Sequence, residues 1–199
     1  MRLFSINLQK QSDEQLLSAV KRGNHPPSLG GAGRGPFDEL YRRYARRLQG
    51  FFYRQLGGDG ERAADATQDV FLRLFEAREH YAEGSNAATW IFTIAYNLCK
   101  NHYRHHAYVA DYLATLDSEP AEEQQTELYM DRAVLHDALK EVLSSLPDPL
   151  HQLFSLRYEE ELTVPQIAVI MDVPEGTIKS RLHKTMNIIR KRLKQYEEK

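Results

Sequence analysis

The C-terminal part of the chain carries a run in which every formal charge is positive. Between Lys179 and Lys194 there are seven Lys or Arg residues and no Asp or Glu, although the formal net charge of the 199-residue chain is -2. Such a local excess is typical of surfaces that neutralise nucleic-acid phosphates. A solvated charged helix is the alternative interpretation, but helices of that kind usually mix both signs.

The residues around this run predict a helix-turn-helix. Thr163 and Gln166 have the spacing of a capping box, which would open a short helix that ends near Met171. Pro174 removes a backbone donor and restricts the residue before it, so the chain must turn before a longer helix starts near Glu175. Apolar residues then recur at helical spacing on one side of the longer helix: Ile178, Leu182, Met186, Ile189 and Leu193.

The first turns of such a second helix enter the major groove, so their polar side chains can contact bases. Basic residues farther along come too late to reach the same bases and would contact phosphates instead. The predicted DNA-binding residues of this helix are Thr177, Lys179, Ser180, Arg181, His183, Lys184 and Lys191.

A second group of polar residues occupies one face of a helix predicted from about Ala87 to His105. Two tyrosines interleaved with an amide and two cations suit unpaired bases, because rings stack on bases, amides bond to base edges and cations hold the backbone. A merely solvated face is the alternative. The residues of this face are Thr93, Tyr96, Asn97, Lys100, Tyr103 and Arg104. Trp90 fits either the core or a base contact, and the core is favoured.

The helix predicted from about Glu61 to Arg78 has an acidic outer side with an apolar residue in it. Asp65, Asp69 and Glu76 surround Leu72, while Thr67, Val70, Phe71, Leu74 and Phe75 form the opposite, core-facing stripe. An apolar residue inside an exposed acidic patch suggests a protein partner that is basic at its rim and apolar at its centre. An incidental surface leucine is the alternative.

No catalytic or metal centre is predicted. Cys99, His102 and His106 share one side of a helix, but a metal site needs three or four converging ligands and no fourth is indicated. The chain has no paired carboxylates with a histidine at ligand spacing, no nucleophile motif and no nucleotide loop, which argues against an enzyme acting on nucleic acid and against a metal-dependent hydrolase. No cofactor is expected.

The remaining segments predict an all-α chain with two small helical domains. The first comprises residues 1–106, with a flexible Pro- and Gly-rich insertion at 24–36, and the second comprises residues 132–199. Residues 107–131 contain seven acidic residues and no Lys or Arg, which is typical of an extended linker.

Further helices are predicted at the chain's start and before the helix-turn-helix. The first opens with Ser12 and Gln15 as a capping box. Others cover residues 37–56, 132–145 and 149–158, the last with Asp148 as N-cap and Pro149 at the first helical position. The start turns polar too soon for a signal peptide, no apolar run could span a membrane, and a single cysteine fits a reducing compartment, so a cytoplasmic location is expected.

Several of these motifs resemble regions 2 and 4 of bacterial RNA polymerase sigma factors of the extracytoplasmic-function (ECF) class. The region 4 resemblance is carried by Leu146-Pro147, Phe154–Tyr158, Thr163–Ile170 and Val173–Leu182. The region 2 resemblance is carried by Asp65–Phe75 and Thr89–Leu98. Their order and separation fit the family, and the resemblance covers about three quarters of the chain. The insertion at 24–36 is a departure, because family members generally join these two helices tightly.

The resemblance implies a promoter-specificity subunit for an envelope or environmental stress regulon. Its C-terminal domain would bind the minus-thirty-five element, and the Ala87 to His105 helix with the loop before it would engage the melted minus-ten element. The partners implied are promoter DNA, an anti-sigma factor, and core RNA polymerase at its largest-subunit clamp helices and its flap region. The polymerase-binding positions that match are Asp65, Gln68, Asp69 and Leu72.

A stand-alone helix-turn-helix regulator that binds operators as a homodimer is the alternative function. The helix that carries Asp65, Asp69 and Leu72 favours the promoter-specificity subunit over the stand-alone regulator. A simple repressor has no reason to carry an acidic partner surface.

Overall fold

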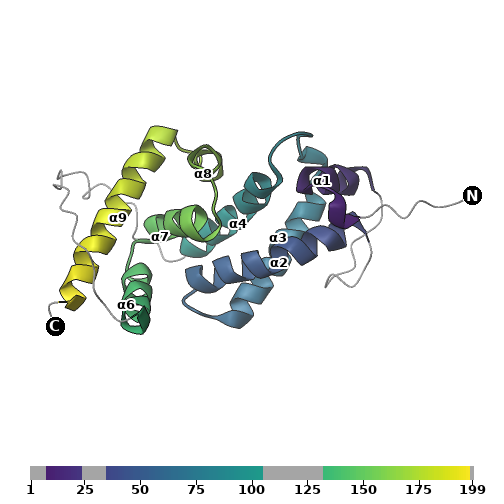
Figure 1. Ribbon diagram of the computed structural model, residues 1–199. Coiled ribbons are helices and arrows are strands. Elements are labelled where there is room, and N and C mark those ends of the chain that lie inside the picture. The colour runs from purple at the N-terminus through teal and green to yellow at the C-terminus, as the bar shows by residue number, and fades with distance from the viewer. Residues whose placement is uncertain (1–7, 24–34, 105–131, 198–199) are drawn as a thin grey trace, which may run out of the picture. The chain divides into compact units, whose positions relative to one another are not determined.

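The computed structural model describes residues 8–23, 35–104 and 132–197, and every regular element within these ranges is helical (Figure 1). The all-α prediction is therefore confirmed. The chain divides into two compact units, Met1–Cys99 and Lys100–Lys199. The predicted linker at 107–131, and the predicted insertion as far as residue 34, lie outside the described residues, so the domain limits stay predictions. None of the described helices combines the length and apolar content that crossing a membrane requires.

The N-terminal unit begins with a locally capped helix. As predicted, the Ser12 hydroxyl accepts from the Gln15 N–H at 3.2 Å, and Gln15 Oε1 accepts from the Ser12 N–H at 2.9 Å. The elements in order are η1 (Leu8–Lys10), α1 (Asp13–Arg22), α2 (Pro36–Gln55), α3 (Gly60–Glu76), η2 (Arg78–His80) and α4 (Ala87–Arg104).

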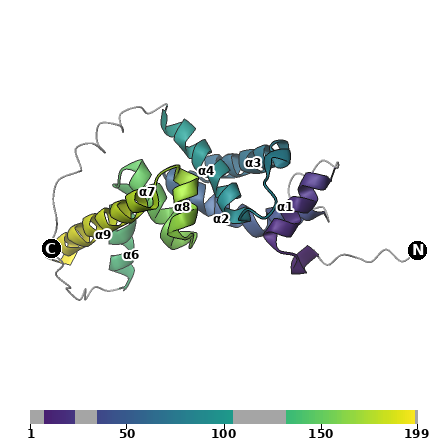
Figure 2. The same ribbon diagram turned by 90° about the horizontal axis from the view of Figure 1, so that it is seen from above.

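Helices α2 and α3 form a hairpin that supplies most of the N-terminal core (Figures 1 and 2). Gly57 and Gly58 adopt φ values of 71° and 85° in the connection, a left-handed conformation that glycine accepts without steric cost. Aromatic rings then join the helices edge to face. The ring centroids of Phe37 in α2 and Phe71 in α3 lie 5.8 Å apart, and so do those of Phe51 in α2 and Phe92 in α4.

A charged network fastens α1 to α2. The Arg43 guanidinium of α2 bonds to Asp13 of α1 at 2.6 Å and to Glu39 at 2.9 Å, and the Tyr44 hydroxyl donates to Asp13 at 2.5 Å. Arg43 also donates to three carbonyl oxygens of the segment before α1, those of Leu8, Gln9 and Gln11. No motif in the sequence analysis predicted this network.

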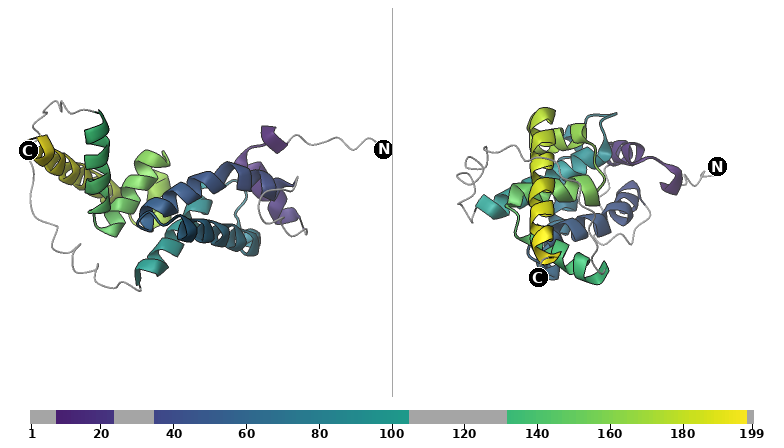
Figure 3. Two further views of the ribbon diagram at one scale, coloured as in Figure 1. Left: turned by 90° about the horizontal axis from the view of Figure 1, so that it is seen from below. Right: turned by 60° about the vertical axis from the view of Figure 1, so that its left-hand side comes forward.

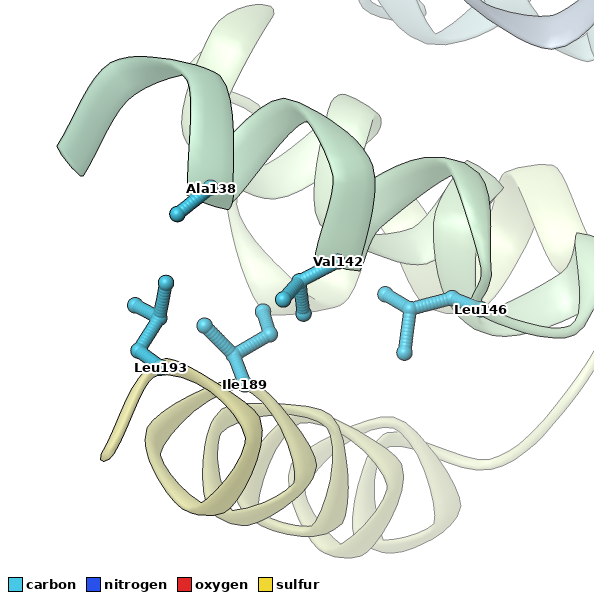
Figure 4. Packing of buried hydrophobic residues seen from close by; sticks show 5 residues of the cluster. All are labelled: Ala138, Val142, Leu146, Ile189 and Leu193. Carbon is cyan, nitrogen blue, oxygen red and sulfur yellow. The ribbon is translucent and has the colours of Figure 1, made fainter. Parts of the chain in front are cut away.

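The C-terminal unit is arranged along its longest helix. Its elements are α6 (Arg132–Ser144), α7 (Asp148–Phe154), the π-helical turn η3 (Ser155–Glu159), α8 (Val164–Met171) and α9 (Glu175–Glu197). Helix α8 leads into the N-terminal end of α9, and α6 packs near the C-terminal end (Figure 3). The core between α6 and α9 consists of Ala138, Val142, Leu146, Ile189 and Leu193 (Figure 4).

The start of α7 corrects one prediction. Pro147, with φ -55° and ψ 140°, is the N-cap, so Asp148 and Pro149 occupy the first two helical positions. The Pro147 carbonyl accepts from the N–H groups of Leu150 and His151 at 2.9 and 3.0 Å. The proline already gives the extended backbone that an N-cap needs, and the Asp148 carboxylate lies in the first turn, where the helix dipole favours it.

Tyr44 yields a prediction on stability at high pH. Burial and the hydrogen bond to Asp13 raise the pKa of Tyr44 above its usual value near 10. The unfolded chain therefore loses the phenolic proton first, and stability should fall above pH 10 by about 1.4 kcal/mol per pH unit for this group. Urea unfolding followed by Trp90 fluorescence between pH 9 and 11 should show a shallower fall for Tyr44→Phe. The exposed Tyr53 is the matched control, and equal slopes for Tyr44→Phe and Tyr53→Phe would contradict the assignment.

Candidate nucleic-acid interface

The helix-turn-helix forms as predicted, with its turn between α8 and α9. Gln166 Oε1 accepts from the Thr163 N–H and from the Thr163 hydroxyl, both at 2.8 Å. Asp172 then ends α8 in the left-handed region, at φ 54° and ψ 50°, which aspartate tolerates better than most residues. The Pro174 carbonyl accepts from the Ile178 N–H at 3.2 Å, so Pro174 opens α9.

The predicted packing stripe of α9 faces the core. Ile178, Ile189 and Leu193 are buried, and Leu182 and Met186 are half-buried. Thr185 is also fully buried, and its hydroxyl donates to the Arg181 carbonyl at 2.8 Å. Sequence reasoning missed Thr185 because its type is polar, although its position three residues after Leu182 and four before Ile189 places it within the stripe.

The seven predicted DNA-binding residues lie outside that stripe's buried centre. Lys179, Ser180, His183 and Lys191 are exposed, whereas Thr177, Arg181 and Lys184 are half-buried. The Ser180 hydroxyl donates to the Thr177 carbonyl at 3.0 Å, and His183 Nε2 lies 3.0 Å from Asn187 Nδ2. Their contact with DNA stays a prediction.

Arg192 differs from the other cations of α9. Its Nη1 donates to the Ser145 carbonyl at 3.4 Å and to the Ser145 hydroxyl. The side chain therefore joins α9 to the end of α6. A phosphate contact would have to replace these bonds.

The outer face of α4 presents fewer free groups than its composition suggests. Asn97 and Lys100 are exposed, while Thr93 and Tyr96 are half-buried, and the Thr93 hydroxyl donates to the Thr89 carbonyl at 2.8 Å. The side chains of Tyr103 and Arg104 lie outside the described residues. Trp90, near the start of α4, is half-buried, and its ring packs against that of the buried Tyr81 with centroids 5.2 Å apart and planes tilted by 53°.

The acidic side of α3 is exposed in the predicted arrangement. Asp65, Gln68 and Asp69 face solvent, and Leu72 is 49% exposed among them. Sequence reasoning missed three other large side chains with apolar surface that are also exposed: Tyr53, Tyr158 and Val169.

The cysteine-histidine group considered as a metal site is only partly visible. Cys99 is fully buried, and the side chain of His102 and all of His106 lie outside the described residues. Within the described part of the chain, no three His, Cys, Asp or Glu side chains gather closely enough to hold a metal ion.

Two family models match the chain, one mainly in the N-terminal unit's sequence and one within the C-terminal unit's sequence. The model of sigma-70 region 2 matches residues 40–108, and the model of sigma-70 region 4 matches residues 136–187. The matches include α3, α8 and α9 as far as Asn187. They occur in the order that the sequence motifs indicated.

Sigma factors of several bacteria are similar over most of their length. The RNA polymerase sigma-H factor of Pseudomonas aeruginosa is 28% identical, covering 94% of this chain and 96% of that protein. The ECF RNA polymerase sigma factor SigW of Bacillus subtilis is 28% identical, with 79% and 89% covered. The ECF RNA polymerase sigma-E factor of Escherichia coli is 24% identical, with 91% and 94% covered.

Two solved structures share the fold. CnrH in complex with the cytosolic domain of CnrY matches with a TM-score of 0.66 and 16% identity, covering 93% of this chain and 99% of that one. The sigma factor RpoE in complex with the anti-sigma factor NepR, from Bartonella quintana, matches with a TM-score of 0.59 and 22% identity, covering 79% and 96%.

A stand-alone regulator is not favoured by these comparisons, because the region 2 match adds a second sigma-factor region to the helix-turn-helix. The chain belongs to the sigma-70 family of RNA polymerase sigma factors and is a transcription initiation factor of its extracytoplasmic-function class.

Proposed function

We propose that the chain binds core RNA polymerase and selects promoters by contacting two DNA elements. The observation that carries this proposal is the charge of α9, the second helix of the helix-turn-helix. Between Lys179 and Lys194 this helix presents exposed cations and contains no acidic residue. It would contact the minus-thirty-five element, and the outer face of α4 would contact the melted minus-ten element. Because the chain acts in transcription, we place it in the bacterial cytoplasm.

Within α9 we assign base contacts to the first turns and phosphate contacts to the later ones. Lys179, Ser180 and His183 are exposed near the helix start, where a helix-turn-helix helix enters the major groove. Lys191 is exposed about three turns after Lys179, too far along the helix to reach the same base pairs. The half-buried Arg181 and Lys184 border the packing stripe and can reach DNA with their long side chains.

The acidic side of α3 is the proposed contact with the clamp helices of the polymerase's largest subunit. Leu72 would occupy the apolar centre of that contact, and Asp65, Gln68 and Asp69 would surround it. The polymerase flap region is the second proposed contact. Tyr158 and Val169 of the C-terminal unit have exposed surface available for it.

Two DNA contacts in one chain favour selectivity. We propose domains at 1–106 and 132–199, joined by an acidic linker at 107–131. Once one domain is bound, tethering makes the second contact effectively intramolecular, so two weak contacts select promoters with both elements at the right spacing.

Control by an anti-sigma factor is part of the proposal. One similar structure is a complex with the anti-sigma factor NepR, and the other is a complex with the cytosolic domain of CnrY. Several of the similar sequences are ECF sigma factors. We therefore propose that an anti-sigma factor holds this chain inactive and that an envelope or environmental stress releases it.

The division within α9 predicts different losses for two lysine variants. Lys184→Ala should weaken the free energy of binding to the preferred upstream element by about 1 to 3 kcal/mol. It should also reduce the discrimination between bases at one or two positions. Lys191→Ala should weaken all duplexes alike and make the salt dependence shallower by about one phosphate contact. The measurement is holoenzyme binding to duplexes chosen by run-off transcription on genomic fragments, as a function of salt. Identical uniform losses with unchanged base preference would rule out the assumed docking of α9.

The polymerase contact predicts that Leu72→Ala combined with Asp69→Ala weakens binding to core polymerase by more than about 1 kcal/mol. Competition against the unmodified chain measures this loss. Leu72 is already half exposed, so the fold should be retained, and upstream-element binding by the C-terminal unit should not change. Glu61→Ala, at an exposed position near the start of α3, is the control. Unchanged affinity in the double variant would remove the proposed surface.

A further inference from the structure

A short exposed loop leads into α4. The α4 entry loop, residues 82–86, is exposed at every position, whereas Tyr81 before it and Ala87 after it are buried. Gly84 has a φ of 86°, and both the N–H and the hydroxyl of Ser85 donate to the Ala82 carbonyl, at 3.0 and 2.7 Å. The loop is therefore a defined tight turn that projects from two buried ends.

Helix α1 bonds to the main chain at both ends of this loop. Lys21 Nζ donates to the Tyr81 carbonyl at 2.8 Å, and the Ala87 N–H donates to Glu14 Oε1 at 3.2 Å. Glu14 and Lys21 are seven residues apart, so they lie on one side of α1 about 10.5 Å apart along its axis. These contacts join positions 60 and 73 residues apart in the sequence.

The Glu14 carboxylate is well placed for the start of α4. Ala87 is the first residue of α4, and a negative charge at a helix N-terminus is favoured by the helix dipole. Burial opposes the ionised form, but hydrogen bonds from the N–H groups of Glu14 itself and of Ala87 outweigh it and lower the pKa of this carboxyl. Asn86 Oδ1 satisfies a second orphan donor of α4, the Thr89 N–H, at 2.9 Å.

We propose that Glu14 and Lys21 are positioning residues for minus-ten recognition, through which α1 holds the α4 entry loop and the start of α4 ready for unpaired DNA. The inference rests on the proposed function of the α4 face. Helix α1 lies outside residues 40–108, which match the region 2 model, so the match itself gives α1 no role.

The physical basis is preorganisation of the loop. Five exposed residues bury little surface, so a loop held only at its tip would have to be ordered when DNA binds, at a cost in conformational entropy. Bonds to both ends remove most of that cost. The bonds from Glu14 and Lys21 also fix where Asn86 and Thr89 lie relative to the bases. Loss of these bonds should therefore reduce discrimination between sequences more than it reduces affinity for any single strand.

Variants of both residues separate this role from general stability. Lys21→Met and Glu14→Met remove the bonding groups but keep the aliphatic stems. Lys21→Arg and Glu14→Gln keep a donor and an acceptor and should restore the behaviour of the unmodified chain. Lys10→Met, at an exposed position before α1, is the matched control.

The chain's single tryptophan gives a readout that needs no DNA. The Trp90 ring packs against the tilted ring of Tyr81, and the Tyr81 carbonyl accepts from Lys21. Loosening the loop should therefore change the emission of Trp90 and increase its quenching by acrylamide. Amide hydrogen exchange at Ala87 should accelerate about tenfold or more in Glu14→Met. Unchanged exchange at Ala87 together with unchanged Trp90 quenching in the double Met variant would overturn the proposal.

The functional readout is selection of single-stranded DNA by the holoenzyme from a pool of oligonucleotides with ten randomised positions. The double Met variant should lower the ratio of preferred to disfavoured sequences about tenfold, while affinities for core polymerase and the duplex upstream element stay unchanged. An unchanged ratio would refute the positioning role. Lack of any preference in the unmodified holoenzyme would instead refute minus-ten recognition itself. The single variant Lys21→Met, at the last turn of α1, decides the question if the double variant does not fold.

Discussion

The arrangement of the N-terminal unit depends on how one half-buried guanidinium is paired. A charge removed from water must find partners within the protein, and Arg43 finds them in three separate places: the carbonyls before α1, Asp13 of α1 and Glu39 of its own helix. These bonds hold the start of α1, and the segment before it, against α2. The position of α1 in turn brings Glu14 and Lys21 to the ends of the α4 entry loop, so Arg43 supports a surface that it does not touch.

The two units distribute their buried surfaces and their proposed contact surfaces over the helices in different ways. Helix α9 carries both kinds of surface, with Ile178, Thr185 and Ile189 buried on one side and the cations of the proposed DNA contact on the other. In the N-terminal unit the tasks are divided among helices: α2 supplies most of the buried rings, α3 carries the acidic exposed side, and α4 presents polar groups. The proposed contact surfaces of α3 and α4 can therefore be changed with little effect on α2.

Local features were predictable from the sequence, and long-range ones were not. The capping boxes at Ser12 and Thr163, and the exposed Leu72, follow from spacing within one helix. The partners of Arg43 outside its own helix lie 30 to 35 residues away, so no local pattern identifies them. The N-cap of α7 was assigned to Asp148 because aspartate is a common cap, whereas the preceding proline already supplies the backbone geometry. The bond from Arg192 to Ser145 could be found only after α6 and α9 were seen together.

The different burial of the polar residues on α9 has an evolutionary consequence. Substitutions at Lys179, Ser180 and His183 alter groups that face solvent, so a duplicated copy of the gene could vary them without losing a folded product. Arg181 and Lys184 are half-buried beside the packing stripe, so changing them also disturbs the fit of α9 against its neighbours. Under the proposed docking of α9, new promoter preferences should therefore arise first at the three exposed positions, and compensating changes in the core should be needed only when divergence extends to the other two.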